Sequence, residues 1–107
     1  MIIKITNQFK KEAKHLLKKY RSLATELKEL NMSLLEYPSQ GIPLGQDCYK
    51  IRLAIKSKKK GKSGGARVIT LVKIIQETVF LLSIYDKSEK DDISEKELEA
   101  FINQIDS

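Results

Sequence analysis

The spacing of apolar residues changes near residue 49, and this change limits the folds that are open to the chain. Before it, apolar residues recur every three or four positions, which is the period of a helix. After it, Tyr49, Ile51 and Leu53 alternate with basic residues, the period of a strand that is buried on one face. Helices followed by consecutive strands are typical of an α+β domain. Because 107 residues suffice for one such domain, we expect residues 1–107 to form a single unit.

Apolar stripes and helix-breaking residues predict the element order β-α-α-β-β-β-α. The expected segments are a strand at 2–5, helices through 9–20 and 23–34, a loop at 37–47, strands at 49–56, 66–73 and 78–85, and a helix beginning at 94. The first two helices meet within a few residues, which predicts an antiparallel hairpin. The last three strands have short connections, which predicts an antiparallel meander.

Polar residues at the expected helix starts support these boundaries. Thr6 or Asn7 is a suitable cap for the first helix, and Ser22 for the second. Ser94 and Glu97 have the spacing of a capping box at the start of the last helix.

Basic residues are concentrated in the middle of the chain. Residues 50–73 contain nine lysines and arginines and no acidic residue, in a chain of net charge +6. Such a block predicts a surface that binds a polyanion, most commonly a nucleic acid backbone. The alternative is a solvated lysine loop that keeps the chain soluble.

The composition excludes several kinds of site. One cysteine, Cys48, and one histidine, His15, cannot form a structural zinc site, so we expect neither a metal nor another cofactor. The letters Gly61-Lys-Ser63 lack the earlier glycine of a phosphate-binding P-loop and lie between two expected strands. No apolar run is long enough for a signal peptide or a membrane span, so we expect a cytoplasmic protein without membrane contact.

Two long motifs resemble a known family. They are the lysine-rich turn with Gly64-Gly-Ala-Arg-Val-Ile69, and the segment Leu81-Leu-Ser-Ile-Tyr-Asp-Lys-Ser-Glu-Lys-Asp-Asp-Ile-Ser94. Both are similar to hallmarks of the RelE/ParE superfamily of type II toxins, and most similar to its HigB-like branch. The resemblance extends from about Phe9, at the start of a Phe-Lys-Lys-Glu segment, to Ile102. It implies a RelE-like α+β fold: two N-terminal helices packed on a twisted antiparallel sheet of about four strands, plus a C-terminal helix.

The resemblance also implies an activity and a partner. Toxins of this family mostly cleave mRNA on the ribosome and are silenced by a cognate antitoxin in a hetero-oligomeric complex. For HigB-like toxins, that antitoxin is a small helix-turn-helix, HigA-like protein. Two other functions remain open: ParE-like inhibition of a protein target without catalysis, and a degenerate module that binds RNA or antitoxin without cutting.

Three residues are the candidate catalytic set. Arg67 can bind two phosphate oxygens with its planar guanidinium and matches the arginine that the family places at this strand. We expect the glycines before it to let a phosphate approach the backbone. Tyr85 can stack on a base. Classical members of the family carry a catalytic arginine in the last strand, but 78–85 contains no basic residue. Either Lys87 substitutes for that arginine, as the HigB-like pattern implies, or the site is weak.

The lysines before Arg67 are the candidate RNA-binding residues. Lys56, Lys58 and Lys60 have alternate spacing, so an extended chain would point them to one side; the full set is Lys56, Lys58, Lys59, Lys60 and Lys62. Each candidate also has a structural alternative: an ion pair to a helix for Arg67, a core position for Tyr85 and a solvated position for Lys87. Alternation also predicts that Ile69 shares the face of Arg67, unless a bulge follows the glycines.

Overall fold

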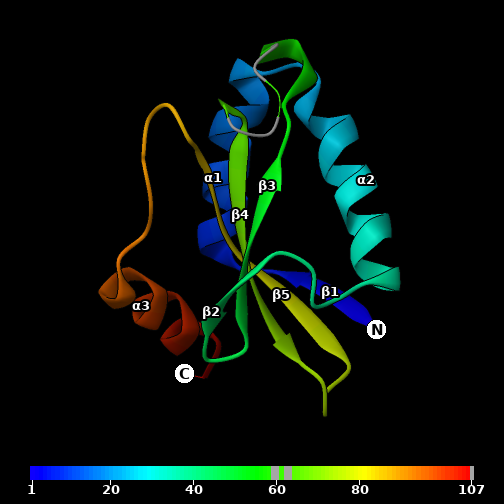
Figure 1. Cartoon of the computed structure of the whole chain (residues 1–107), viewed down its shortest axis with the longest axis vertical. Coiled ribbons are helices and arrows are strands. Elements are labelled where there is room, and N and C mark those ends of the chain that lie inside the picture. Colours follow the sequence, from blue (N-terminus) through cyan, green and yellow to red (C-terminus); the bar gives the residue numbers. More distant parts are fainter. Residues whose placement is uncertain (59–60, 62–63, 107) are drawn as a thin grey trace.

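Five strands form one mixed sheet in the order β1-β5-β4-β3-β2 (Figure 1). The structure, a computed structural model, describes residues 1–58, 61 and 64–106. The strands are β1 (Ile2–Ile5), β2 (Ile42–Gly45), β3 (Cys48–Leu53), β4 (Ala66–Lys73) and β5 (Thr78–Asp86). The α+β class and the meander of β3, β4 and β5 are confirmed. The expected antiparallel sheet of about four strands differs from the structure in two details: the predicted strand β1 pairs with β5 in parallel, and a fifth strand, β2, is present.

The fifth strand, β2, lies in the segment that was expected to be a loop. It pairs with β3 at the edge of the sheet, where Pro43 is tolerated because an edge strand need not donate every N–H. Gln46 and Asp47 join the two strands with φ values of 56° and 62°, the paired left-handed residues of a tight hairpin turn. β2 has only four residues, and two of them are Pro43 and Gly45. The sequence therefore shows no alternation from which this strand could be predicted.

The helices cover the two faces of the sheet separately. Helices α1 (Asn7–Lys19) and α2 (Leu23–Glu36) share one apolar core with β3, β4 and β5, and α3 (Glu95–Asp106) closes a second core on the opposite face. Figure 1 shows the chain turning back between α1 and α2, as the predicted hairpin requires.

The predicted caps are confirmed at two of the three helix starts. The Thr6 hydroxyl accepts the N–H of Phe9 at 3.1 Å. The capping box is complete, since Ser94 Oγ accepts from the Glu97 N–H at 3.1 Å and Glu97 accepts from the Ser94 N–H at 3.0 Å. Ser22 lies at the start of α2, but its hydroxyl donates to Glu26 instead of capping the helix backbone.

The strand predicted for 49–56 ends early. β3 stops at Leu53, and Lys56–Lys58 form one turn of 3-10 helix. The reason is a buried carboxylate: Glu26 of α2 is 3% exposed and accepts the Lys56 N–H at 2.5 Å, which draws the chain away from the sheet. Lys56 and Lys58 therefore lack the alternate orientation that an extended chain would give them, and Lys60 lies outside the described residues.

A bulge in β5 changes which face its side chains take. Ile69 pairs with Ser83 and Thr70 pairs with Leu81, so Leu82 is an extra residue on β5. Before the bulge, Val79 and Leu81 face α1 and α2; after it, Ile84 does, and Tyr85 joins the core under α3. The bulge therefore lies in β5, and not after the glycines at the start of β4, where the sequence alone leaves a bulge open.

Gly65 is required by close packing in the protein itself. A Cβ on Gly65 would lie 2.1 Å from the carbonyl oxygen of Leu53, so the missing side chain accommodates β3. This packing is a requirement of the fold itself, and the expectation that the glycines let a phosphate approach the backbone stays a prediction.

We predict that Gly65→Ala destabilises the protein by more than about 2 kcal/mol, because the backbone of two central strands must separate. Gly45→Ala is the comparison, because a Cβ there meets nothing within 4 Å and only the φ of 86° is strained, at a cost of about 1 kcal/mol. Urea unfolding measures both; equal losses would contradict the packing argument.

Candidate functional site

Arg67 and Tyr85 are direct neighbours across β4 and β5, on the face of the sheet that α3 partly covers. They are paired residues in the antiparallel ladder, so their side chains lie on the same side. Each is 5% exposed. Ile69 shares this face and packs under α3, as the alternation predicted. One Nη atom of Arg67 donates to the carbonyl oxygen of Ala66 at 3.2 Å, which fixes the guanidinium near the strand end.

Strand β3 adds two basic residues to the same face. Lys50 pairs with Ile69 and Arg52 pairs with Arg67, which places both side chains on the Arg67 side of the sheet. The alternation in the sequence predicts a basic face on this strand, but Lys50 and Arg52 were not among the expected site residues. The alternation of basic residues indicates that Lys50 and Arg52 lie on one face of β3. Only the pairing of β3 with β4 shows that this is also the face of Arg67.

The Tyr85 hydroxyl is surrounded by charged groups. It lies 3.4 Å from the Asp92 carboxylate, and the Lys90 Nζ lies 5.9 Å from the centre of its ring. Burial and the nearby Asp92 raise the pKa of Tyr85 to about 12, and the positive charge of Arg67 acts in the opposite direction. Tyr85 is therefore a protonated hydrogen-bond donor at neutral pH.

Lys87 continues β5 by one more ladder contact. Its backbone N–H donates to the carbonyl oxygen of Gly65 at 3.0 Å, so it lies two residues beyond Tyr85 on a continued strand. Its amino group pairs with the Asp91 carboxylate and donates to the Asp91 carbonyl oxygen at 2.9 Å. The side chain thus folds over the segment that leads to α3.

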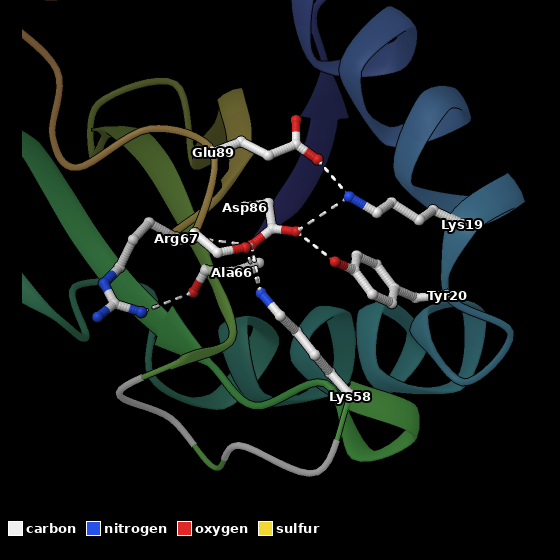
Figure 2. A network of polar contacts seen from close by, with 8 residues as sticks. Lys19, Tyr20, Lys58, Ala66, Arg67, Asp86 and Glu89 are labelled. Carbon is white, nitrogen blue, oxygen red and sulfur yellow. Dashed lines mark hydrogen bonds and ion pairs between the residues drawn. The ribbon is translucent and has the colours of Figure 1, made fainter.

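Asp86 forms a separate buried network on the opposite face (Figure 2). Its side chain is 0% exposed and pairs with the amino group of Lys58, whose side chain is 8% exposed. The Tyr20 hydroxyl donates to it at 2.5 Å, and Ser88 donates from its N–H at 2.9 Å and its hydroxyl at 2.7 Å. In Figure 2, Lys58 and Tyr20 point towards Asp86, whereas the Arg67 guanidinium points away.

These contacts keep Asp86 ionised. Burial alone would raise the pKa of Asp86, but the hydrogen bonds from Lys58, Tyr20 and Ser88 outweigh it and hold that pKa well below the ordinary value of 3.8. The network joins the end of α1, the start of the lysine-rich turn and the end of β5.

The predicted RNA-binding lysines therefore have different surroundings. Lys58 is committed to Asp86 inside the protein. Lys56 is exposed at the start of the 3-10 turn. The remaining lysines of the set lie outside the described residues: Lys59, Lys60 and Lys62.

Some features of the described chain lie away from these residues. A surface hollow of about 770 Å³ lies beside the start of α1 and the end of α3, and it is not lined by Arg67, Tyr85 or Lys87. Among residues 1–58, 61 and 64–106, no group of three His, Cys, Asp or Glu side chains is placed to hold a metal ion. Within the same residues, no helix has the length and apolar character needed to span a membrane.

We predict that Asp86→Asn lowers the free energy of unfolding by about 3 kcal/mol at neutral pH, because it leaves the buried Lys58 ammonium without its counter-charge. Asp91→Asn, at a side chain that is 95% exposed, is the control and changes stability little. Because folding lowers the pKa of Asp86, its stabilisation is present above pH 4 and is lost as the pH falls below about 4. Asp86→Asn must therefore flatten the acid side of the stability profile; an unchanged profile would contradict the network.

Comparisons with known proteins agree on one family. A family model described as the RelE toxin of the RelE/RelB toxin–antitoxin system matches residues 1–105. The isolated RelE toxin of Escherichia coli has a similar structure, with 23% identity, 97% of each chain covered and a TM-score of 0.55. A double arginine-to-alanine mutant of the same toxin in the free state matches with 22% identity and a TM-score of 0.58, over 84% of this chain and 86% of that one. A search of the curated proteins finds no significant match. The two structural likenesses show a shared fold, and the match over residues 1–105 shows that this chain belongs to the RelE toxin family.

Proposed function

We propose that this protein is a toxin of the HigB-like type that cleaves mRNA on the ribosome. The observation that carries the proposal is the grouping of Arg67, Tyr85, Lys50 and Arg52 on one face of the sheet. Three of these side chains are cationic, and they come from the stretch 50–73, which contains nine basic residues and no acidic one. A protein that only bound a protein target would need fewer positive charges in one stretch.

The proposed reaction uses the 2′-hydroxyl of the RNA as the nucleophile. The 2′-hydroxyl loses its proton to solvent and its oxygen bonds to the adjacent phosphorus. The bond to the 5′-oxygen breaks and that oxygen takes up a proton from solvent, which leaves a 2′,3′-cyclic phosphate and a 5′-hydroxyl. Arg67 would stabilise the extra negative charge on the phosphate, with Lys87 as a second positive charge near the strand end. Tyr85 would donate a hydrogen bond to a phosphate oxygen or stack on a base, since its hydroxyl stays protonated.

The lysine-rich segment 56–62 would bind the RNA backbone. We assign this role to Lys56 and, from their charge in the sequence, to Lys59, Lys60 and Lys62. Lys58 was also predicted to bind RNA; we propose that it instead holds the turn in place through Asp86.

The proposed partner is a helix-turn-helix, HigA-like antitoxin that forms a hetero-oligomeric complex with the toxin. Acidic segments of such a partner would be attracted to the concentration of basic residues in 50–73.

We predict that Arg67→Met lowers the rate of mRNA cleavage by roughly 10²–10³, and that Arg67→Lys recovers only part of it because lysine lacks the two-point guanidinium contact. Mapping of mRNA 5′ ends in expressing cells measures the effect. Since Arg67 is buried, each variant is first shown to be folded by thermal unfolding. Arg21→Met, at an exposed arginine between α1 and α2, is the control. Cleavage by folded Arg67→Met at the normal rate would refute the assignment, and no new 5′ ends from the wild-type protein would refute the proposed function.

We predict that replacing Lys56, Lys59, Lys60 and Lys62 together by alanine weakens ribosome binding and its dependence on salt. The slope of log affinity against log salt falls by roughly 3, because each phosphate contact contributes about 0.7 to 0.9. A control that removes the same charge from exposed helix positions leaves the slope unchanged; it replaces Lys10, Lys14, Lys18 and Lys28. Equal slopes for the two variants would show that the turn does not contact RNA.

A further inference from the structure

One carboxylate oxygen lies between two groups of the proposed site. Asp92 Oδ1 is 3.4 Å from the Lys50 Nζ and 3.4 Å from the Tyr85 hydroxyl. The same oxygen accepts the N–H of Ile93 at 2.8 Å. An ammonium and a hydroxyl that converge on one anionic oxygen are the donors that also bind a phosphate oxygen.

The chain presents Asp92 to this position from the segment between β5 and α3. Lys87 and Asp91 pair at the start of that segment, and Lys90 pairs with Glu97 at the start of α3. The segment therefore crosses the end of the sheet where Tyr85 lies. Asp92 of this segment contacts Lys50 and Tyr85, which both belong to the proposed RNA site.

Asp92 is held weakly enough to be displaced. Its two contacts of 3.4 Å are longer than a normal hydrogen bond, and its side chain is 56% exposed. Exposed pairs of this kind are screened by solvent and contribute little free energy. Asp86, six residues earlier, is the contrasting case, because it is fully buried and accepts from Lys58, Tyr20 and Ser88.

We infer that Asp92 is an internal competitor for RNA: its carboxylate occupies the position at Lys50 and Tyr85 that a backbone phosphate takes when RNA binds. The inference rests on the proposed function, since it assigns an RNA phosphate to that site. It adds a residue whose negative charge sets the affinity of the site without taking part in the reaction.

The test compares two variants that lose one negative charge each. Asp92→Asn removes the competitor, and Glu95→Gln removes an exposed acid three residues further along the chain. The probe is a fluorescent single-stranded RNA of eight uridines, titrated at low salt against the full-length protein. We expect Asp92→Asn to bind the probe roughly two- to five-fold more tightly than Glu95→Gln, the range expected for loss of an exposed ion pair. Equal affinities of the two variants would overturn the inference.

Two further measurements tie the effect to the observed contacts. In a Lys50→Met background, the gain in RNA affinity of Asp92→Asn over Glu95→Gln must become smaller. The reason is that Lys50, one of the two groups that the Asp92 carboxylate contacts, is gone. In the single variant Asp92→Asn the pKa of Tyr85 must fall from about 12, since Asp92 contributes to raising it. If the gain in RNA affinity stayed the same without Lys50, or if the pKa of Tyr85 did not change in Asp92→Asn, Asp92 would not act through these two contacts.

These results separate the inference from the proposed function. Tighter RNA binding by Asp92→Asn in a protein that cuts no mRNA would support the competitor and refute the nuclease. Normal mRNA cleavage with equal affinities of Asp92→Asn and Glu95→Gln would refute the competitor alone.

Discussion

The single extra residue in β5 determines how the rest of the site is arranged. Because Leu82 interrupts the alternation, Tyr85 faces the α3 side with Arg67, and Asp86 faces the α1 side with Tyr20. With regular alternation these two neighbours would exchange faces, which would bury the tyrosine among the helices and place a carboxylate beside Arg67. An acid at that point would neutralise the charge that the proposed reaction needs. The bulge therefore separates the residues that hold the fold from those proposed to bind RNA.

Two aspartates near the end of β5 show how burial decides what a carboxylate does. Asp86 is fully buried, accepts from Lys58, Tyr20 and Ser88, and fastens the base of the lysine-rich turn to the sheet. Asp92 is half-exposed and has long contacts with Lys50 and Tyr85, and we propose that an RNA phosphate takes its place. The same chemical group therefore stabilises the structure in one place and, in our proposal, tunes ligand affinity in the other.

Features that depend on local sequence could be predicted, and features that depend on distant partners could not. The Thr6 cap, the Ser94–Glu97 capping box and the helix stripes involve residues within one or two turns, so their patterns are visible in the sequence. The parallel pairing of β1, the edge strand β2 and the extra residue Leu82 depend on which strands become neighbours. Lys58 belongs to a run of lysines that the local sequence does not tell apart, and its contact with Asp86, 28 residues later, is visible only in the structure. Lys50 and Arg52 could be recognised as a basic face, but their relation to Arg67 required the register of β3 and β4.

The central claim is that this face of the sheet promotes attack by the RNA's own 2′-hydroxyl. The most direct measurement is cleavage, by purified protein, of a defined mRNA held on the ribosome, with a single 2′-deoxynucleotide at the position that is cut. Our account predicts that the all-ribose mRNA yields a 2′,3′-cyclic phosphate and a 5′-hydroxyl, and that the 2′-deoxy mRNA is not cut at that position. Equal cleavage of the two mRNAs, or no cleavage of the all-ribose mRNA by active protein, would contradict it.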